Sequence, residues 1–351
     1  MSQPAGRPTL PDIRHRQRLV RQITGCWRTQ ALHAAVLLDI PDRLARGNGE
    51  IAELATVCQC PADSLMRLLR ALCTLKVCRQ RRDGRFELTA AGDALRRSPA
   101  DGADSLRALT LWWGGAMWSL WSDLAYSVQT GHSARARQTG VAHYGFLDQQ
   151  PDTAPVFHQA MQAMTGLIAQ ELAHWPAWHN TRALVDVGGG HGTLAAAIAL
   201  AHPRLQVSVL DREDARPAPD SDYGRLMQSG RARFCPGDFF QAVPAGADRY
   251  LLKSILHNWD DTQAACILGV CAAAARPGAR LLLVERVRPE RLRATVHDEA
   301  LTRTDLNMLA GLGGRERSLA EFSALLEAAG FRLDQVAPTR HEFSVIEAIR
   351  L

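Results

Sequence analysis

The hydrophobic and polar positions divide the chain into a helical N-terminal part and a C-terminal part in which short apolar runs alternate with helices. In the N-terminal part, apolar residues recur at helical spacing in three stretches, and two short strands flank a turn at Asp83-Gly84. We predict helices over 13–38, 51–58 and 61–75, and strands around Val77 and over 85–88. Two helices followed by a hairpin predict a winged helix-turn-helix.

The predicted helix over 61–75 bears on the role of this domain. Arg67 and Arg70 suit a DNA-reading helix, but most of the other side chains are apolar and cover a wide arc. A buried or subunit-packing role is therefore favoured over DNA binding. Because the apolar faces within residues 13–110 exceed what one small domain buries alone, we expect a homodimer built mainly from this region.

The middle of the chain leaves two interpretations open. Residues 106–129 hold four of the eight tryptophans, and a helix predicted over 152–174 presents one apolar face. That face holds Phe157, Met161 and Met164. Such side chains usually form core, but they also suit the wall of a pocket for a flat aromatic molecule. The polar stretch 133–144 predicts an exposed connection.

From residue 183 to the C-terminus, short apolar strands alternate with helices. We predict strands over 184–187, 205–210, 232–235, 249–252 and 280–284, and helices over 194–200, 262–275 and 319–329. This alternation is typical of a doubly wound parallel sheet, an α/β fold of the Rossmann-like class. The last two strands, 331–336 and 343–349, are joined by a short loop and predict a C-terminal antiparallel hairpin.

The first of these strands runs into a glycine-rich turn. Its glycines, at 188, 190 and 192, let the backbone turn tightly against a ligand that faces the N-terminus of the next helix. A dinucleotide-binding fingerprint needs glycine or alanine at position 193, where this chain has Thr193. Asp211, at the end of the second strand, can accept both hydroxyls of a ribose. We therefore predict a nucleotide-like ligand that is not a dinucleotide.

Composition narrows the class of protein. With 46% hydrophobic and 22% charged residues, the chain is an ordinary globular protein, and its longest apolar run, 109–120, is too short to span a membrane. The net charge of +5 is spread along the chain, which is weak support for a nucleic-acid partner. Eight cysteines without a C-x-x-C pair predict free thiols and no metal site. Because residues 1–12 lack an apolar signal core, we expect a disordered tail and a cytoplasmic protein.

Three further segments fall at the ligand-facing ends of strands. They are Gly237-Asp238-Phe239-Phe240, the run from Lys253 to Asp261, and Val284-Glu285-Arg286. Together with the glycine turn and the C-terminal hairpin, they resemble the S-adenosylmethionine-dependent small-molecule O-methyltransferase family of plant caffeic acid and bacterial polyketide, hydroxyneurosporene and phenazine methyltransferases. The resemblance covers nearly the whole chain. It implies an enzyme that uses S-adenosylmethionine, releases S-adenosylhomocysteine, needs no metal and dimerises through its winged-helix domain.

The resemblance also implies roles for individual residues. It assigns cofactor binding to Asp186, Gly188, Gly190, Gly192, Asp211, Gly237, Asp238, Phe239, Lys253, Ser254 and Trp259. It assigns the acceptor pocket to Phe157, Met161, Met164, Asn307 and Met308. Its general base matches His257, flanked by the acids Glu285 and Glu316. Two departures are Asn258, where many members have aspartate, and the stretch 133–144, which matches poorly.

These assignments agree with the chemistry of the reaction. A phenol with a pKa of about 10 is mostly protonated at neutral pH, so a histidine with a pKa near 6.5, poised by carboxylates, is a suitable base. We predict methyl transfer to a hydroxyl of a flat aromatic secondary metabolite, of the phenazine or polyketide type found in antibiotic biosynthesis. One alternative is a ligand-sensing winged-helix transcription regulator with a methyltransferase-like domain. The other is a non-methylating member of the family, in which the cofactor has only a structural role.

The domain boundaries follow from these patterns. We predict a disordered tail over 1–12 and a winged-helix dimerisation domain over 13–105. A helical linker with the substrate-pocket helices follows over 106–180, and the S-adenosylmethionine-binding catalytic domain covers 181–351.

Overall fold

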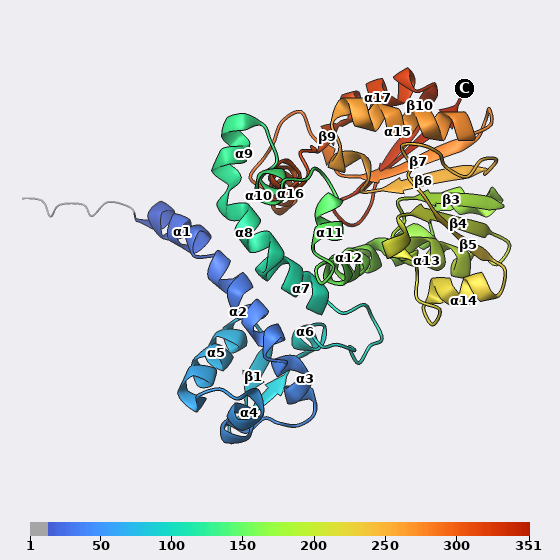
Figure 1. Ribbon diagram of the computed structural model, residues 1–351. Coiled ribbons are helices and arrows are strands. Elements are labelled where there is room, and N and C mark those ends of the chain that lie inside the picture. The colour runs from blue at the N-terminus through green and yellow to red at the C-terminus, as the bar shows by residue number, and fades with distance from the viewer. Residues whose placement is uncertain (1–12) are drawn as a thin grey trace, which may run out of the picture. The chain divides into compact units, whose positions relative to one another are not determined.

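The computed structural model describes residues 13–351, which fall into two compact units divided between Gly114 and Gly115 (Figure 1). The predicted tail over 1–12 lies outside the described residues. The boundaries placed at 105/106 and 180/181 stay predictions. Among the described residues, no helix combines the length and the apolar character that crossing a membrane requires.

The N-terminal unit contains the predicted helix, helix and hairpin. Its elements are α1 (Arg14–Ile23), α2 (Cys26–Leu37), α3 (Ile40–Ala45), α4 (Ile51–Cys58), α5 (Ala62–Thr74), β1 (Cys78–Gln80), β2 (Phe86–Leu88), α6 (Ala90–Asp93) and α7 (Arg107–Gly114). The strands β1 and β2 pair antiparallel, with Cys78 opposite Leu88. Leu65, Leu69 and Leu72 of α5 are at most 2% exposed and belong to the core of this unit, which agrees with the packing role predicted for this helix.

The single helix predicted over 13–38 is wrong, because the chain breaks it into α1 and α2. The Thr24 hydroxyl donates to the Val20 carbonyl, and the Gly25 amide donates to the Gln22 carbonyl in a tight turn. Glycine is also a weak helix former. These local hydrogen bonds interrupt the helix, although the apolar repeat of the sequence continues on both sides of the break.

The larger unit is built around a seven-stranded sheet. Its strands are β3 (Ala183–Val187), β4 (Gln206–Asp211), β5 (Ala232–Pro236), β6 (Arg249–Lys253), β7 (Arg280–Glu285), β10 (Phe331–Pro338) and β11 (Ser344–Arg350). The strand order is β10-β11-β7-β6-β3-β4-β5, and β11 is antiparallel to both β10 and β7 while the other pairs are parallel. This confirms the predicted Rossmann-like sheet and its C-terminal hairpin.

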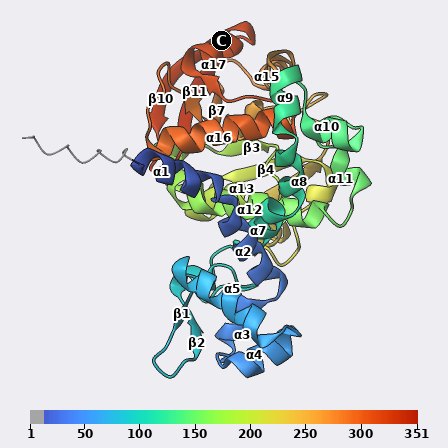
Figure 2. The ribbon, with the colours of Figure 1, turned by 90° about the vertical axis from the view of Figure 1, so that its left-hand side faces the viewer.

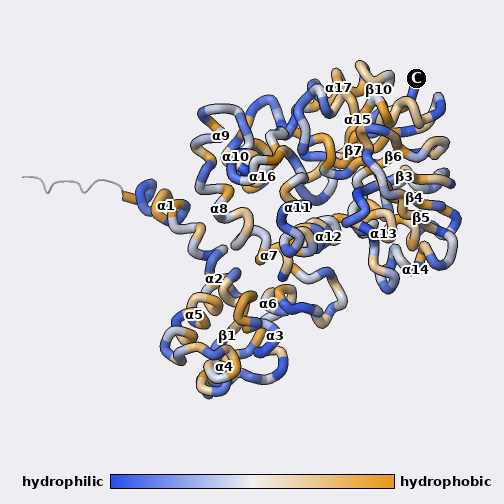
Figure 3. The backbone as a smooth tube through the Cα atoms, viewed as in Figure 1, coloured by the Kyte–Doolittle hydropathy of each residue, from blue (hydrophilic) through white to orange (hydrophobic). Residues whose placement is uncertain are grey.

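Helices cover both faces of this sheet. They are α12 (Ala154–Ala173), α13 (Thr193–Ala201) and α14 (Asp222–Gln228) on one face, and α15 (Asp261–Ala274) and α17 (Leu319–Ala328) on the other (Figure 1). Alternate strand residues therefore enter different cores. Leu184 packs in the core that includes α12 and α13, whereas Val185 packs in the core that includes α15 and α17. Figure 3 shows hydrophobic stretches along the central strands.

A layer of helices lies beside the sheet. It contains α8 (Ala116–Ser122), α9 (Leu124–Thr130), α10 (Ala134–Thr139), α11 (Gly145–Gln149) and α16 (Val296–Gly311). Helix α16, which the apolar pattern did not predict, contacts α8, α9 and α10 (Figure 2). It was missed because its buried residues include the polar Asp298 and small residues such as Ala310 and Gly311 rather than one apolar stripe.

The prediction that the stretch 133–144 is an exposed connection is wrong. It forms α10, in which Ala134 and Arg135 are buried. The Arg135 guanidinium lies 4.0 Å from the centroid of the Phe146 ring, and its Nη2 lies 3.0 Å from the Met117 sulfur. The arginines of this stretch look like surface residues in the sequence, but an arginine can be buried over an aromatic ring.

Candidate active site

The glycine-rich turn follows β3 at the carboxyl edge of the sheet. Gly188, Gly190 and Gly192 have positive φ angles of 73°, 57° and 77°. A Cβ on Gly192 would lie 2.5 Å from the Tyr223 ring, whereas a Cβ on Gly190 would meet nothing within 4 Å. Packing thus requires glycine at 192, while the backbone at Gly190 faces open space that a ligand can approach.

Asp211, the last residue of β4, joins this turn to the neighbouring strand. The Gly190 amide donates to Asp211 Oδ2 at 2.7 Å, and the Arg212 amide donates to Asp211 Oδ1 at 2.7 Å. Burial raises the pKa of Asp211 although both amides favour its charged form. Each carboxylate oxygen keeps a lone pair for a further donor, such as the ribose hydroxyls that the sequence predicts.

Asp186 supplies an unpaired buried carboxylate oxygen beside the turn. The residue is 2% exposed, and its Oδ2 has no hydrogen-bond partner within residues 13–351. Burial and the Asp211 carboxylate raise the pKa of Asp186 to about 7, against the effect of Lys253. An unpaired buried carboxylate next to an open glycine turn fits a ligand with cationic groups, which S-adenosylmethionine carries.

Lys253 and Ser254 lie at the end of β6. Lys253 Nζ is 3.5 Å from Ser254 Oγ and 5.3 Å from the centroid of the Phe343 ring. Burial and the neighbouring Arg286 lower the pKa of Lys253 to about 8. The side-chain Nδ2 of Asn258 donates to the Ser254 carbonyl at 3.0 Å, so asparagine at this position holds the turn that follows β6.

The segment predicted to contact adenine follows β5 and lies among aromatic rings. The centroids of Phe239 and Phe240 lie 6.0 and 4.7 Å from that of Trp259. The carboxylate of Asp238 accepts from the Phe240 amide at 2.9 Å. A ring-lined surface of this kind suits a flat purine.

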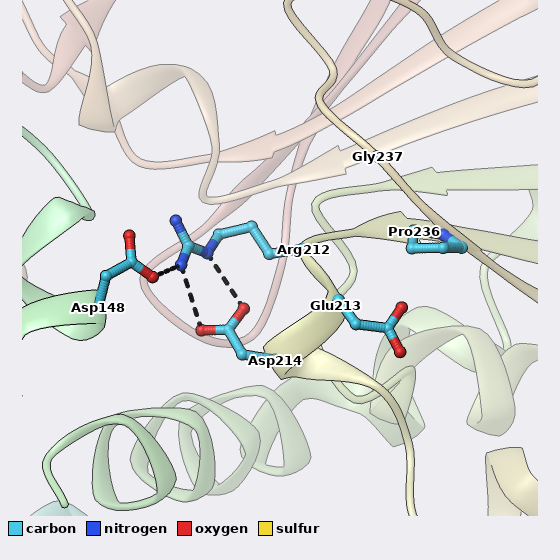
Figure 4. A pocket seen from close by; sticks show the side chains of 6 residues that line it. All are labelled: Asp148, Arg212, Glu213, Asp214, Pro236 and Gly237. Atoms are coloured by element: carbon cyan, nitrogen blue, oxygen red, sulfur yellow. Dashed lines mark hydrogen bonds and ion pairs between the residues drawn. The ribbon is translucent and has the colours of Figure 1, made fainter. Parts of the chain in front are cut away.

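An open pocket of about 730 Å³ adjoins this segment. It is lined by Asp148, Arg212, Glu213, Asp214, Pro236 and Gly237 (Figure 4). Arg212 forms ion pairs with Asp148 of α11 and with Asp214, as the dashed lines in Figure 4 show. Arg212 follows Asp211 and Gly237 precedes Asp238, so the pocket is lined by the chain neighbours of the predicted ribose and adenine residues.

The three predicted catalytic residues come together beside the ends of β6 and β7. His257 is 6% exposed, Glu285 0% and Glu316 1%. His257 Nδ1 lies 3.0 Å from Glu316 Oε1. Within residues 13–351 this is the only group of three His, Cys, Asp or Glu side chains whose ligand atoms all lie within 4.8 Å of one another. The structure thus assembles a histidine with two buried carboxylates.

Local backbone contacts explain why the two acids take these positions. Glu285, the last residue of β7, accepts from the Ile255 and Leu256 amides through Oε1 at 3.0 and 2.9 Å. The Glu316 amide donates to Asp305 Oδ1 at 2.7 Å. Oε2 of both glutamates has no hydrogen-bond partner in the described part of the chain. One oxygen of each acid therefore remains for a proton or a ligand.

The electrostatics of the group favour a charged histidine. Burial opposes the imidazolium form of His257, but Glu316 and Glu285 together outweigh burial, so the pKa of His257 is raised. Burial also raises the pKa of Glu285, with Glu316 acting in the same direction. With Nδ1 directed to a carboxylate, the acceptor position of a neutral imidazole is Nε2.

The residues predicted for the acceptor pocket lie on α12 and α16. Phe157 packs 5.9 Å from Tyr144, whose ring is 6.1 Å from Trp259, so the aromatic residues of α12 reach the cofactor side. Asn307 Oδ1 accepts from Trp121 Nε1 at 3.3 Å. Met161 and Met164 are half-buried and Met308 is buried. No hydrogen bond or ring contact recorded for the described residues joins these methionines to His257.

The sequence did not single out Tyr144 and its neighbour His143 as site residues. The His143 ring lies 4.4 Å from that of Trp259, and Tyr144 is close enough to Asp211 and Glu285 for both carboxylates to raise its pKa in addition to burial. Both residues belong to the connection that leads into α11. Their aromatic character was the one signal in a stretch that otherwise looked polar.

Comparisons with known proteins place the chain in a family. The O-methyltransferase domain matches residues 121–332, and the O-methyltransferase dimerisation domain matches residues 20–98. The phenazine O-methyltransferase PhzM of Lysobacter antibioticus is 33% identical over 335 residues, which cover 94% of this chain and 95% of that protein. The chain therefore belongs to the O-methyltransferase family, as its sequence motifs predict, and it is an enzyme of that class.

Solved structures agree with this assignment. The crystal structure of LaPhzM has a TM-score of 0.87 and 32% identity, and the match covers 96% of this chain and 99% of that one. The O-methyltransferase NcsB1 from neocarzinostatin biosynthesis has a TM-score of 0.73 and 33% identity, with 92% and 96% covered. That structure contains S-adenosylmethionine and 2-hydroxy-5-methyl naphthoic acid. The predicted cofactor is thus the one bound in this relative.

Proposed function

We propose that this enzyme transfers a methyl group from S-adenosylmethionine to a hydroxyl of a flat aromatic secondary metabolite, with His257 as the general base. The observation that carries this proposal is the 3.0 Å contact between His257 Nδ1 and Glu316 Oε1. A carboxylate at Nδ1 fixes the tautomer that leaves Nε2 free to accept a proton.

Residues of the glycine turn and the strand ends would hold the cofactor. Asp186 and the turn around Gly190 would contact its methionine part, Asp211 its ribose, and Asp238 with Phe239 its adenine. When bound, S-adenosylmethionine supplies an electrophilic methyl group on a positively charged sulfur. The protein's own task is to place the acceptor hydroxyl, exclude water and remove one proton.

His257 performs the proton step in this proposal. Its neutral Nε2 takes the proton of the acceptor hydroxyl, and the resulting imidazolium is stabilised by Glu316 and Glu285, which already favour this charge. The acceptor oxygen loses its proton to His257 as it gains the methyl group, so His257 becomes positively charged between two carboxylates that keep their own charge. This suits a phenol, which is mostly protonated at neutral pH.

The acceptor class rests on the aromatic lining and on the relatives. Phe157, Tyr144 and Trp121 offer flat apolar surfaces, and Asn307 adds a polar amide. Relatives named for phenazine and naphthoate substrates share about a third of the sequence. We infer an acceptor of the phenazine or polyketide type.

Product analysis tests the function directly. Pure enzyme is incubated with S-adenosylmethionine and a panel of hydroxyphenazines, hydroxynaphthoic acids, catechols and simple phenols, and the products are analysed by mass spectrometry. A mass gain of about 14 Da on an aromatic hydroxyl supports the proposal. Release of no methylated product from any acceptor, by protein that binds S-adenosylhomocysteine, would exclude it.

We also propose that the enzyme works as a homodimer formed by its N-terminal unit. Apolar side chains remain exposed on α1 and α2, with Ile23 73% and Trp27 70% exposed. Exposed apolar surface of this extent usually marks an interface. The burial of Leu65 and Leu69 shows that one face of α5 packs into the core of this unit. The eight cysteines, all free thiols, are consistent with a cytoplasmic location.

A further inference from the structure

Arg317 is a fully buried arginine whose guanidinium donates hydrogen bonds to one short segment. It lies on β9 (Arg317–Ser318) and is 0% exposed. Its Nη1 donates to the Leu256 carbonyl at 2.7 Å and its Nη2 donates to the Trp259 carbonyl at 2.7 Å. Its Nε donates to Asp261 Oδ1 at 2.9 Å. All three nitrogens therefore donate to acceptors within residues 256–261.

These acceptors bracket the predicted base. Leu256 begins the 3-10 turn η3 (Leu256–Asn258), and Trp259 follows it, so the two carbonyls lie on either side of His257. The Arg315 amide donates to the His257 carbonyl itself at 2.9 Å. A Cβ on Gly314 would lie 2.1 Å from the same carbonyl oxygen, which shows how closely the segment before β9 follows the turn.

The acid that pairs with His257 directly precedes the strand that carries Arg317. Glu316 directly precedes Arg317, and β9 pairs in parallel with β8 (Val287–Arg288), where Val287 lies opposite Arg317. Glu285 lies two residues before Val287. One short ladder and one guanidinium therefore set the spacing of the histidine from both carboxylates.

A packing role alone does not require this residue. Burying a guanidinium is costly unless its donors are satisfied, and Asp261, the carboxylate that pairs with it, is half exposed. A planar fork with fixed donor directions can hold two carbonyls at a set separation, which an ammonium group cannot do. The geometry of the contacts thus favours a positional role.

We propose that Arg317 is a positioning residue that holds the His257 turn in register with Glu316 and Glu285. The consequence for catalysis rests on the proposed function of His257 as the base. Loss of the guanidinium fork would let the turn move while the cofactor residues on β3 and β4 stay in place.

The charged groups that act on His257 are Glu316, Glu285 and Arg286. If the turn loosens, these contributions and the effect of burial all weaken, so the pKa of His257 returns downward toward 6.5. This change distinguishes positioning from general destabilisation, which lowers the fraction of active protein but does not change the titration of the histidine in the folded fraction.

The test compares Arg317→Lys and Asp261→Asn with the control Arg288→Lys. Arg288 lies on the neighbouring strand β8, and the substitution alters its ion pair to Glu321 of α17. The imidazole of His257 is titrated by NMR in the full-length protein saturated with S-adenosylhomocysteine, and its resonance is assigned by its loss in His257→Gln. We expect the pKa of His257 to fall in Arg317→Lys and to fall less in Asp261→Asn. The control should match the wild type.

Turnover gives a second measurement, with 1,4-dihydroxy-2-naphthoic acid as the acceptor probe. We expect kcat to fall roughly 10–100-fold in Arg317→Lys, which exceeds the accompanying change in KM and in affinity for S-adenosylhomocysteine. An unchanged His257 pKa in folded Arg317→Lys, or an equal shift in Arg288→Lys, would overturn the proposal.

Two further outcomes are informative. If Arg317→Lys does not fold, Asp261→Asn decides the question, and an unchanged pKa of His257 in that variant counts against positioning. If His257→Gln keeps full turnover, the base assignment fails, but the NMR titration still shows whether Arg317 holds the turn.

Discussion

His257 Nδ1 and Glu316 Oε1 lie 3.0 Å apart although the two residues are 59 positions apart in the chain. Both side chains are buried, so solvent does not compete for the hydrogen bond. The bond fixes the orientation of the imidazole and raises its pKa. A buried histidine oriented by a carboxylate in this way is a suitable general base.

Replacing the base should reduce turnover strongly. We expect His257→Ala to lower kcat by about 10²–10⁴-fold with nearly unchanged affinity for S-adenosylmethionine, because the imidazole is not among the side chains assigned to the cofactor. The loss should shrink at high pH and with more acidic phenols, whose hydroxyl is already ionised. Steady-state kinetics with calorimetry checks this. Near-normal turnover of a weakly acidic phenol at neutral pH would show that His257 is not the base.

The carboxylate partner should control the pH dependence. Glu316 favours the imidazolium, so the wild-type pKa of His257 lies above 6.5 and kcat falls as pH drops through it. Glu316→Gln removes this charge, so the acid limb of the profile should move to lower pH while the plateau falls by roughly 10-fold or more. A pH profile of kcat for both proteins measures the shift. If the acid limb of the Glu316→Gln profile lies at the same pH as that of the wild type, Glu316 does not raise the pKa of His257.

Binding of S-adenosylmethionine should depend on the ionisation of Asp186. Burial raises the pKa of Asp186 to about 7, and a cationic ligand favours the ionised form. Affinity should therefore increase about tenfold between pH 6 and pH 8 and level off above. Asp186→Asn should bind more weakly and show a flatter profile; titration of the ligand's own amino group is common to both proteins. Calorimetry across this range checks the prediction, and identical pH profiles would disprove it.

Asp211 should contribute to affinity through its hydrogen bonds. We expect Asp211→Ala to weaken binding of S-adenosylmethionine by roughly 1.5–3 kcal/mol, the range for hydrogen bonds to a charged group, with the fold intact. Part of this loss comes from the freed Gly190 amide, since Asp211 also holds the glycine turn. Calorimetry on folded protein tests the value. Unchanged affinity would show that Asp211 does not bind the cofactor.

The oligomeric state should depend on the exposed apolar side chains of α1 and α2. We expect a dimer in light scattering at micromolar concentration and a shift toward monomer in Trp27→Glu, because a charge would be buried in the interface. Val296→Glu is the matched control, since Val296 is 85% exposed but lies outside residues 13–110. A wild-type monomer, or equal effects of both variants, would count against this interface.

The sequence by itself determined the class of fold and the composition of the site. The alternation of apolar runs and helices after residue 183 specifies a parallel sheet, because strands buried on both faces must be apolar throughout. Residues at strand ends, such as Asp186, Asp211 and Glu285, must then meet at one edge. The glycine turn and the position of His257 after β6 are local features that a linear pattern records directly.

Only the tertiary structure decided how these residues act. Glu316 reaches His257 because β9 pairs with β8, and neither strand, at two residues each, leaves a periodic signal. Arg317 and Arg135 look like surface arginines in the sequence, yet both are buried. Their environment depends on side chains brought together from distant segments. The pKa values of His257 and Asp186 likewise depend on burial and on charges that become neighbours only when the chain has folded.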